Sequence, residues 1–372
     1  MSDTKTRSRS PAHLHVITAS RRRLLTPRRE VLRFLLRAPS EFIAFMKMLR
    51  KAEEVRELVN AAFELETPCF FAVDFELENG LFLSGEDLKE GGDVRFRVGK
   101  FSNAAASKPL GRATRLRALP ESFETYRVRF DKVMRAIIDG DSYLANLTIR
   151  TPIETDVSLE EIFGAAQSAF ALYVKDSFAC FSPERFVKIE GGKVSSFPMK
   201  GTAEAASAEA LAALMADEKE LAEHYTIVDL IRNDLNIFSE NVRVERFRYA
   251  EKVARFGLPP IFQTSSEISA DYPDCVPLGD YIWAMLPAGS VSGAPKRRTV
   301  EILRGVEGEP RGFYAGVFGF FDGKDFDSAV AIRFIEKRGD SYFYRSGGGI
   351  TCNSSALYEY REAAAKIYLP FG

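Results

Sequence analysis

The sequence predicts an α+β fold in which antiparallel β-sheets dominate. Segments with the β-branched and aromatic residues of strands outnumber the helical segments, and most strand segments follow one another as hairpins. With 372 residues, 46% of them hydrophobic, and 30 phenylalanines, the chain can bury a large core, as one large domain or as two smaller ones.

Composition argues against several classes of function. A formal net charge of −1 gives the chain no overall preference for nucleic acid or for an anionic membrane. No apolar run approaches the length of about 18 residues that crosses a bilayer. The four cysteines stand far apart without a C-x-x-C pair, and three histidines leave little for a histidine-ligated zinc site. We therefore expect a cytoplasmic protein that binds neither nucleic acid nor membrane.

The first 45 residues differ from the rest of the chain. They hold nine arginines and very few acids, without the apolar stretch of a signal peptide. A nucleic-acid arm and a targeting peptide are alternatives, but we expect residues 1–45 to be a disordered or loosely helical extension. Residues 46–119 are expected to form a reduced N-terminal subdomain that contributes strands, and residues 120–372 the catalytic domain.

The order of the elements follows from periodicity and from turn residues. Apolar residues at helical spacing predict helices at residues 51–66, 121–141, 158–170, 220–236, 294–305 and 356–366. Apolar and alternating runs predict two strands within residues 68–83 and further strands at residues 142–154, 171–182, 185–198, 241–247, 313–322 and 327–350.

Local signals predict three of the boundaries. An Asn-Gly pair supplies positive φ, so Asn79 and Gly80 are expected in the turn between the first two strands. Gly140 is expected to end the second helix. Ser158 is expected to cap the third helix, with Glu161 completing a capping box.

The helix expected at residues 220–236 carries an unusual charge pattern. Glu220 and Glu223 are three residues apart, so their carboxylates point to the same side, and like charges repel unless a cation lies between them. Glu359 and Glu362 repeat this spacing in the last helix. A solvated charged face is the alternative. Two such pairs suit a hard cation such as Mg²⁺, which keeps waters and also takes substrate oxygens.

Eight sequence blocks resemble, in the same order, those of the chorismate-utilising enzymes: GDSYLANLT, FSPERF, FPMKGTAEA, ELAEHYTIVDLIRNDL, LPAGSVSGAPKRR, RGFYAGVFGFFD, DSAVAIRF and RSGGGITCNSSALYEYREAAAK. This family includes anthranilate synthase component I, isochorismate and salicylate synthases, and aminodeoxychorismate synthase component I. The resemblance covers roughly residues 120–372. It implies two large antiparallel sheets packed face to face, with helices on the outside and the active site between the sheets.

The resemblance also assigns roles to single residues. Mg²⁺ would lie at Glu223 and Glu362, with Glu220 and Glu359 as close partners, and would bridge to the ring carboxylate of chorismate. Arg333 would hold the enolpyruvyl carboxylate through its planar fork. Further contacts to the substrate are expected from Tyr314, Thr202, Ser292, Lys296 and the backbone amides of Gly348 and Gly349. By itself, the glycine run could also be a hairpin turn.

Two residues are candidates for proton transfer. Glu184 in the FSPERF block resembles the general acid of the family, which needs a pKa raised by burial. The alternative is a turn carboxylate paired to Arg185. His224 directly follows a proposed metal ligand, and packing, hydrogen bonding and catalysis are all open for it.

Lys200 distinguishes between members of the family. Its block reads P-M-K-G-T, whereas the corresponding block of anthranilate synthases has the pattern P-x-A-G-T. A lysine at this position resembles the lysine of aminodeoxychorismate synthase. In that enzyme the lysine amine attacks ring C2 while the C4 hydroxyl leaves. A surface lysine at a strand end is the alternative. By the same resemblance, Leu144 occupies the position at which isochorismate and salicylate synthases have a lysine that activates water. Gln263 occupies the position at which anthranilate synthases have a histidine.

These residues favour an enzyme that converts chorismate and ammonia to 4-amino-4-deoxychorismate for p-aminobenzoate and folate synthesis. No cysteine lies in a nucleophile-elbow context, so a separate glutamine amidotransferase subunit is expected to supply the ammonia. Anthranilate synthase component I is the alternative enzyme, disfavoured by Lys200 and Gln263. A non-catalytic chorismate-binding protein is the third hypothesis.

Overall fold

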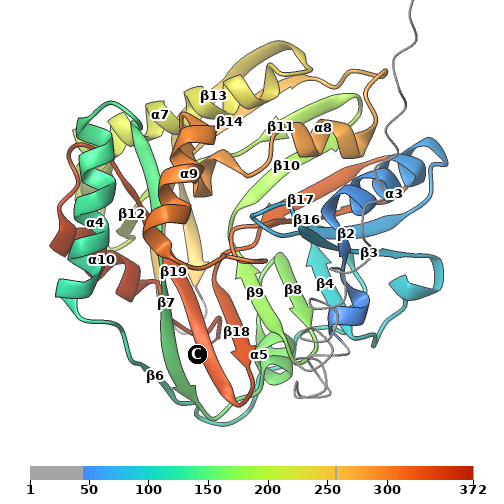
Figure 1. The fold of residues 1–372 in the computed structure, drawn as a ribbon, viewed down its shortest axis with the longest axis horizontal. Coiled ribbons are helices and arrows are strands. Elements are labelled where there is room, and N and C mark those ends of the chain that lie inside the picture. Colours follow the sequence, from blue (N-terminus) through green and yellow to red (C-terminus); the bar gives the residue numbers. More distant parts are fainter. Residues whose placement is uncertain (1–44, 256–257, 372) are drawn as a thin grey trace, which may run out of the picture.

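The computed structural model describes residues 45–255 and 258–371. Two antiparallel sheets form the body of the protein, with helices on the outside (Figure 1), which confirms the predicted fold class. The extension expected at residues 1–45 lies outside the described residues except for Phe45. The ring of Phe45 packs against Phe178 and Phe313, so this residue is part of the folded body.

The first sheet combines strands from the beginning, the middle and the later part of the described sequence. Its strands are β1 (Arg50–Lys51), β2 (Cys69–Val73), β3 (Asn79–Ser84), β10 (Arg185–Glu190), β11 (Lys193–Ser196), β12 (Met199–Glu204), β13 (Glu240–Arg255), β14 (Leu258–Asp271), β16 (Val317–Phe321) and β17 (Phe326–Val330). Their order is β1-β3-β2-β16-β17-β10-β11-β14-β12, and β13 also pairs with β14.

The second sheet is built in the same antiparallel way. It holds β4 (Val94–Val98), β5 (Phe101–Ser102), β6 (Leu116–Ala118), β7 (Leu144–Thr155), β8 (Phe170–Val174), β9 (Phe178–Ser182), β15 (Gly293–Ala294), β18 (Phe334–Arg338) and β19 (Ser341–Ile350). The order is β15-β7-β19-β18-β9-β8-β4-β5, with β6 paired to β7.

Helices cover the sheets at several places. They are α3 (Ala52–Glu64), α4 (Phe123–Ile138), α5 (Leu159–Ala165), α6 (Ala208–Ala216), α7 (Glu218–Leu235), α8 (Leu278–Ala284), α9 (Lys296–Glu307) and α10 (Ala356–Ala365), with short 3₁₀ turns η1 (Gly85–Leu88) and η2 (Gly289–Val291). α4 packs against α9 and α10 beside β7 and β19 (Figure 1). Within the described residues, no helix is long and apolar enough to span a membrane.

Phenylalanine rings join the two sheets into one core. Phe70 of β2 in the first sheet stacks on Phe96 of β4 in the second, with ring centroids 4.3 Å apart. Offset stacking of this kind adds to the burial of apolar area. Because β2, β3, β4 and β5 all come from residues 46–119, this part of the chain supplies strands to both sheets and shares their core.

The structure confirms two of the three local boundary predictions. Gly140 follows α4 with a φ of 83°, in the left-handed region that favours glycine. The Ser158 side chain accepts from the backbone N–H of Glu161, whose carboxylate accepts in return from the Ser158 backbone N–H. This reciprocal pair is the predicted capping box.

The predicted Asn-Gly turn is wrong. The Asp74 carboxylate organises this turn by accepting from the backbone N–H groups of Glu78 and Asn79, and Leu77 takes the positive φ of 59°. Gly80 lies inside β3, where a Cβ would come within 2.8 Å of the Ala72 carbonyl oxygen. The glycine is therefore explained by a close approach between strands rather than by a turn.

Candidate active site

Chemically reactive side chains gather around one cavity of about 420 Å³. Its lining includes β12 and β14 of the first sheet, β19 of the second sheet, and the helices α7 and α10. The residues that were expected at the site and that line this cavity are Glu184, Lys200, Thr202, Glu220, Glu223, Tyr314, Arg333, Gly348, Gly349, Glu359 and Glu362. Segments far apart in the sequence are thus brought together at one place.

Two helices present the four carboxylates to the cavity. Asp217 begins α7 by accepting a hydrogen bond from the Glu220 backbone N–H, 2.9 Å long, which fixes the first turn. Burial raises the pKa of Glu220, and the neighbouring carboxylate of Glu223 raises it further. Burial likewise raises the pKa of Glu359, and Glu362 adds to this rise. Glu223 and Glu359 are the most enclosed of the four, with side chains 10% and 2% exposed. Enclosed carboxylates of this kind require cations nearby.

Lysine ammonium groups supply this positive charge. Lys219 Nζ lies 3.6 Å from Glu223 and 3.3 Å from Glu359, and so connects α7 to α10. Lys366 Nζ lies 2.8 Å from Glu362. Burial opposes ionisation of Glu362, but Lys366, followed by Lys200 and Lys219, leaves its pKa below the ordinary value.

The carboxylates fit Mg²⁺ by their chemistry. Among the described residues, no group of three or more histidine, cysteine or acidic side chains is arranged to hold a metal ion. Mg²⁺ commonly takes only one or two protein carboxylates and completes its shell with waters and substrate oxygens, so such a group is not required. An ion between Glu223 and Glu359 would compete with the ammonium group of Lys219, which lies between them.

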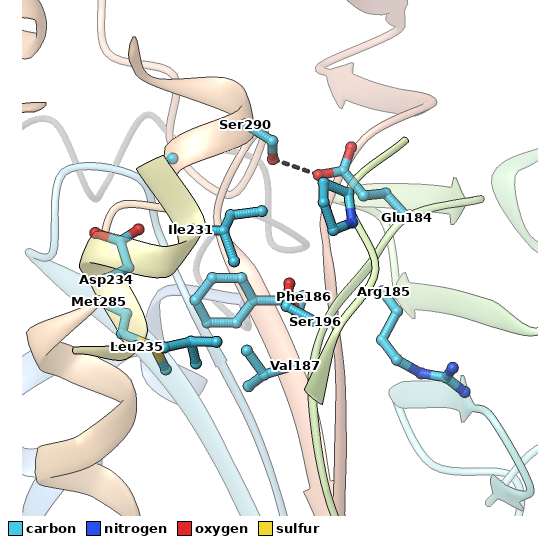
Figure 2. Close-up of a pocket in the computed structure, with 12 residues that line it drawn as sticks. Glu184, Arg185, Phe186, Val187, Ser196, Ile231, Asp234, Leu235, Met285 and Ser290 are labelled. Carbon is cyan, nitrogen blue, oxygen red and sulfur yellow. Dashed lines mark hydrogen bonds between the residues drawn. The ribbon is translucent and has the colours of Figure 1, made fainter. Parts of the chain in front are cut away.

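Glu184 stands just before β10 and faces η2. The Ser290 hydroxyl donates a hydrogen bond to its carboxylate, and Arg185 points away from this contact (Figure 2). Arg185 instead pairs with Asp327 at 2.8 and 3.1 Å, so the alternative pairing with Glu184 is wrong. Burial raises the pKa of Glu184, although Ser290 and the cations Lys200, Arg333 and Lys366 oppose the rise.

A second, much smaller cavity lies behind Glu184. Its volume is about 20 Å³, and its lining includes Glu184 and Ser290 (Figure 2), which also line the main cavity. That volume is sufficient for about one water molecule. The remaining lining is largely apolar, with Ile231 and Leu235 from α7 and Phe186 from β10. Glu184 and Ser290 therefore contact both cavities.

Arg333 and Tyr314 both line the cavity and lie near enough to affect each other's ionisation. Arg333 has a φ of 54°, an uncommon value for a residue other than glycine, and its Nε donates to the Tyr368 hydroxyl at 3.0 Å. Backbone strain of this kind concentrates at functional sites. Burial raises the pKa of Tyr314 to about 12, so its hydroxyl keeps its proton as a donor.

The glycine run forms part of a strand and not a hairpin turn. β18 begins at Phe334, opposite Arg345, so from Ser346 onward β19 pairs, among the described strands, only with β7. Successive residues of an antiparallel ladder point their N–H and C=O groups to alternate sides. Gly347 accepts from Lys366 at 2.8 Å on the cavity side, so Gly349 shares this direction and Gly348 points its amide toward β7. This corrects the role expected for the Gly348 amide.

Lys200 lies inside the cavity and is not a surface lysine. Its side chain is 18% exposed, and its Nζ lies 3.7 Å from Glu223. A Cβ added to Gly349 would lie 3.3 Å from Lys200 Nζ and 3.1 Å from Leu144 Cδ1. The amine therefore reaches the glycine strand at a point where the neighbouring side chain from β7 is apolar.

Two expected substrate-binding residues do not line the cavity. Ser292 is fully buried, and its hydroxyl donates to the Ala288 carbonyl at 2.8 Å. Lys296 begins α9 and pairs with Asp234 at 2.7 Å while it also donates to the Met285 carbonyl. Both side chains are used by local structure, which corrects their expected contact with the substrate.

His224 also lies outside the lining of the cavity. Its Nε2 hydrogen-bonds the Ser266 hydroxyl at 2.6 Å, and the side chain is fully buried. Burial, followed by Arg248 and Lys200, lowers its pKa to about 4, so the ring is neutral near pH 7. The structure therefore gives His224 a packing and hydrogen-bonding role.

Several cavity residues were missed by the sequence reasoning. Lys219 and Lys366 each stand four residues from a proposed metal ligand on the same helix, and this spacing could have indicated them. Ser290, Arg345 and Tyr368 line the cavity without any local signal that separates them from neighbouring residues of the same type.

Two antiparallel sheets with outer helices, and a cavity lined by carboxyl groups and lysine amines, are the features to compare with known enzymes. The chorismate binding enzyme family matches residues 83–371, and the chain belongs to this family.

Three known proteins illustrate the similarity. An "uncharacterized PabA-like protein" of Haemophilus influenzae is 41% identical over 316 residues, which are 84% of this chain and 95% of the relative. Aminodeoxychorismate synthase component 1 of Bacillus subtilis is 32% identical over 68% of this chain and 56% of its own length. The crystal structure of anthranilate synthase component I from Streptococcus pneumoniae superimposes with a TM-score of 0.58 and 28% identity, over 68% of this chain and 59% of that one.

Proposed function

We propose that the chain is the chorismate-converting component of an aminodeoxychorismate synthase, which forms 4-amino-4-deoxychorismate from chorismate and ammonia. The observation that carries this proposal is the position of Lys200, whose amine lies in the cavity beside Gly349 and Leu144. Leu144 offers no base that could activate water at this point. Gln263, also in the lining, cannot act as the imidazole of an anthranilate synthase would.

The proposed reaction has two steps, and in each step one bond to the ring forms while another breaks. The Lys200 amine bonds to ring C2, the ring double bond shifts, and the C4–O bond breaks while Glu184 gives the proton with which the hydroxyl leaves as water. Ammonia then bonds to C4, the double bond shifts back, and the C2–N bond to Lys200 breaks. The net reaction consumes one ammonia and releases one water.

Anion binding and charge neutralisation orient the substrate for these steps. Arg333 and the Tyr314 hydroxyl hold the enolpyruvyl carboxylate, and the Gly349 amide points to the same cavity. Mg²⁺ held by Glu223 and Glu362, with Glu220 and Glu359 nearby, would neutralise the ring carboxylate and make the ring a better electrophile. Thr202 also lines the cavity and is a further substrate contact in this proposal.

The proposal includes a partner. Ammonia comes from glutamine through a separate amidotransferase subunit, and free ammonia can replace it. The naming of the H. influenzae relative as PabA-like and of the B. subtilis relative as an aminodeoxychorismate synthase component supports this arrangement. All four cysteines are free thiols, which supports a reducing compartment such as the cytoplasm.

Product identification tests the proposal. The purified full chain is incubated with chorismate, Mg²⁺ and ammonium, and the products are separated by liquid chromatography and identified by mass. We expect 4-amino-4-deoxychorismate, with p-aminobenzoate appearing only after a lyase is added. Anthranilate, isochorismate or salicylate as the main product would contradict the proposal, and so would the absence of any turnover.

A further inference from the structure

The strand that carries Lys200 does not pair regularly with its neighbour. Met199 lies opposite Ser265 and Thr202 lies opposite Gln263, so Lys200 and Gly201 together face the single residue Thr264. Two residues opposite one define a β-bulge, which bends the strand and changes the direction of a side chain. Gly201 has a φ of 79°, as the bulge requires of a glycine.

A bulge breaks the local ladder and leaves backbone groups in need of partners. The Thr264 hydroxyl donates a hydrogen bond to the Lys200 carbonyl oxygen, and Thr264 is fully buried. Thr264 itself is firmly held, because β14 pairs with β12 on one side and with β13 on the other. The hydroxyl thus fastens the backbone of Lys200 to the middle strand of three.

The bulge also has little free space around it. A Cβ on Gly201 would lie 3.0 Å from a Glu220 carboxylate oxygen and 3.2 Å from Leu214 Cδ1. The backbone at Lys200 and Gly201 is therefore bounded by side chains of α6 and α7 and by Thr264. From this fixed base the Lys200 side chain extends to Glu223 and to Gly349.

We propose that Thr264 is a positioning residue for Lys200: its hydroxyl fixes the bulge and so holds the amine at the distance and angle needed to attack the substrate. This inference rests on the proposed function, because it assumes that Lys200 is the nucleophile. Thr264 itself does not line the cavity and touches the reacting atoms only through Lys200. A displacement of about 1 Å at a reacting group can cost on the order of 100-fold in rate.

Two substitutions separate the hydroxyl from the volume of the side chain. Thr264→Val keeps nearly the same shape and removes the donor, whereas Thr264→Ser keeps the donor. We expect Thr264→Val to lower kcat by about 10-fold or more, while the KM for chorismate stays within about 2-fold, because the lost group acts on the reaction and not on binding. Thr264→Ser is expected to recover most of kcat.

A matched control measures the general cost of losing a buried hydroxyl. Thr299 is also fully buried, and its hydroxyl donates to the Pro295 carbonyl at 2.8 Å, away from the cavity. Thr299→Val therefore makes the same chemical change elsewhere in the fold. Thermal unfolding of all variants shows whether each is folded at the assay temperature. A kcat for Thr264→Val equal to that of Thr299→Val would overturn the inference, as would a Thr264→Ser variant no better than Thr264→Val.

Amide hydrogen exchange tests the same inference without turnover. In Thr264→Val we expect faster exchange in the peptide that covers residues 199–204, whereas β2 of the same variant should exchange as in the wild type. In Thr264→Ser the peptide of residues 199–204 should exchange at the wild-type rate. Unchanged exchange at residues 199–204 would overturn the proposed role of Thr264. Absence of any Lys200–substrate adduct in the wild type would instead overturn the proposed function, so the two failures are distinguishable.

Discussion

The two walls of the cavity are built in different ways. Along the strands, Lys200 is fixed by a bulge, and the Gly349 amide takes its direction from the register between β7 and β19. On the helices, the carboxylates of α7 and α10 are instead balanced by long lysine side chains. The strand wall therefore positions groups through the backbone, whereas the helix wall holds carboxylates whose charge is balanced by side chains.

The largest effect is expected on the helix wall. Glu223→Gln and Glu362→Gln should each lower turnover by about 100-fold or more, because each would remove an anionic oxygen from the proposed Mg²⁺ site without changing the shape of the side chain. Activity as a function of Mg²⁺ concentration and calorimetric titration with Mg²⁺ measure the effect. Glu301→Gln, at an exposed carboxylate of α9, is the control. Wild-type activity at limiting Mg²⁺ would remove both residues from the metal site.

Arg333 lies between β17 and β18, and Arg333→Lys should weaken substrate binding. A lysine cannot reproduce the planar two-donor contact with a carboxylate, so we expect KM for chorismate to rise by about 30-fold, equivalent to about 2 kcal/mol. Steady-state kinetics measure this change. Arg185→Lys is the matched control, because Arg185 pairs with Asp327 and points away from the site (Figure 2). An unchanged KM in Arg333→Lys would show that another group binds this carboxylate.

A smaller effect is expected at Ser290 and appears in the pH dependence. In the proposed reaction Glu184 is the protonated acid, so kcat/KM should fall as pH rises through its pKa. The Ser290 hydroxyl stabilises the ionised form and lowers this pKa, against the rise caused by burial. Ser290→Ala should therefore move the alkaline limb of the kcat/KM profile to higher pH, while Lys200, Arg333 and Lys366 still face the carboxyl group.

Two controls accompany the pH profile. Ser290→Thr keeps the donor and should restore the wild-type limb. Ser196→Ala removes a hydroxyl from the small cavity that donates to the Phe186 carbonyl and not to Glu184, so it should leave the limb in place. A limb that stays in place in Ser290→Ala, or that moves to lower pH, would contradict the assignment of Glu184 as the acid.

The smallest effect on catalysis is expected at Lys296. Lys296→Met leaves Asp234 enclosed without its partner, so the variant should lose about 3 kcal/mol of stability, measured by denaturant unfolding. Because Lys296 does not line the cavity, kcat and KM should stay close to the wild-type values at a temperature where the variant is folded. A selective rise in the KM for chorismate would return Lys296 to the substrate site.

Sequence reasoning succeeded where one element carries the signal. Helical periodicity predicted α7 to within two residues at each end, and the spacing of Glu220 and Glu223 placed both on one side of it. It failed where contacts with a second segment of the chain determine which side chain faces the cavity. Ser290 and Ser292 stand in the same short turn, yet only the packing against Glu184 shows which of them faces the cavity.

The strand wall gives further examples of this limit. Whether Gly348 or Gly349 offers its amide depends on the register with β7, and a run of three glycines contains no information on register. The bulge at Lys200 likewise depends on Thr264, more than 60 residues away in the chain. The block P-M-K-G-T could predict the lysine and the glycine but not the group that holds them.

Trapping a covalent adduct tests whether Lys200 is the nucleophile. The wild type is mixed with chorismate and Mg²⁺ without ammonia, so that an adduct on Lys200 cannot be released by amination, and the protein is digested and analysed by mass spectrometry. We expect a chorismate-derived mass on the peptide that contains Lys200, and no such mass in Lys200→Ala. The turnover of Lys200→Ala should fall by about 100-fold or more while chorismate still binds. An unmodified Lys200, together with full formation of the 4-amino product by Lys200→Ala, would contradict the assignment of Lys200 as the nucleophile.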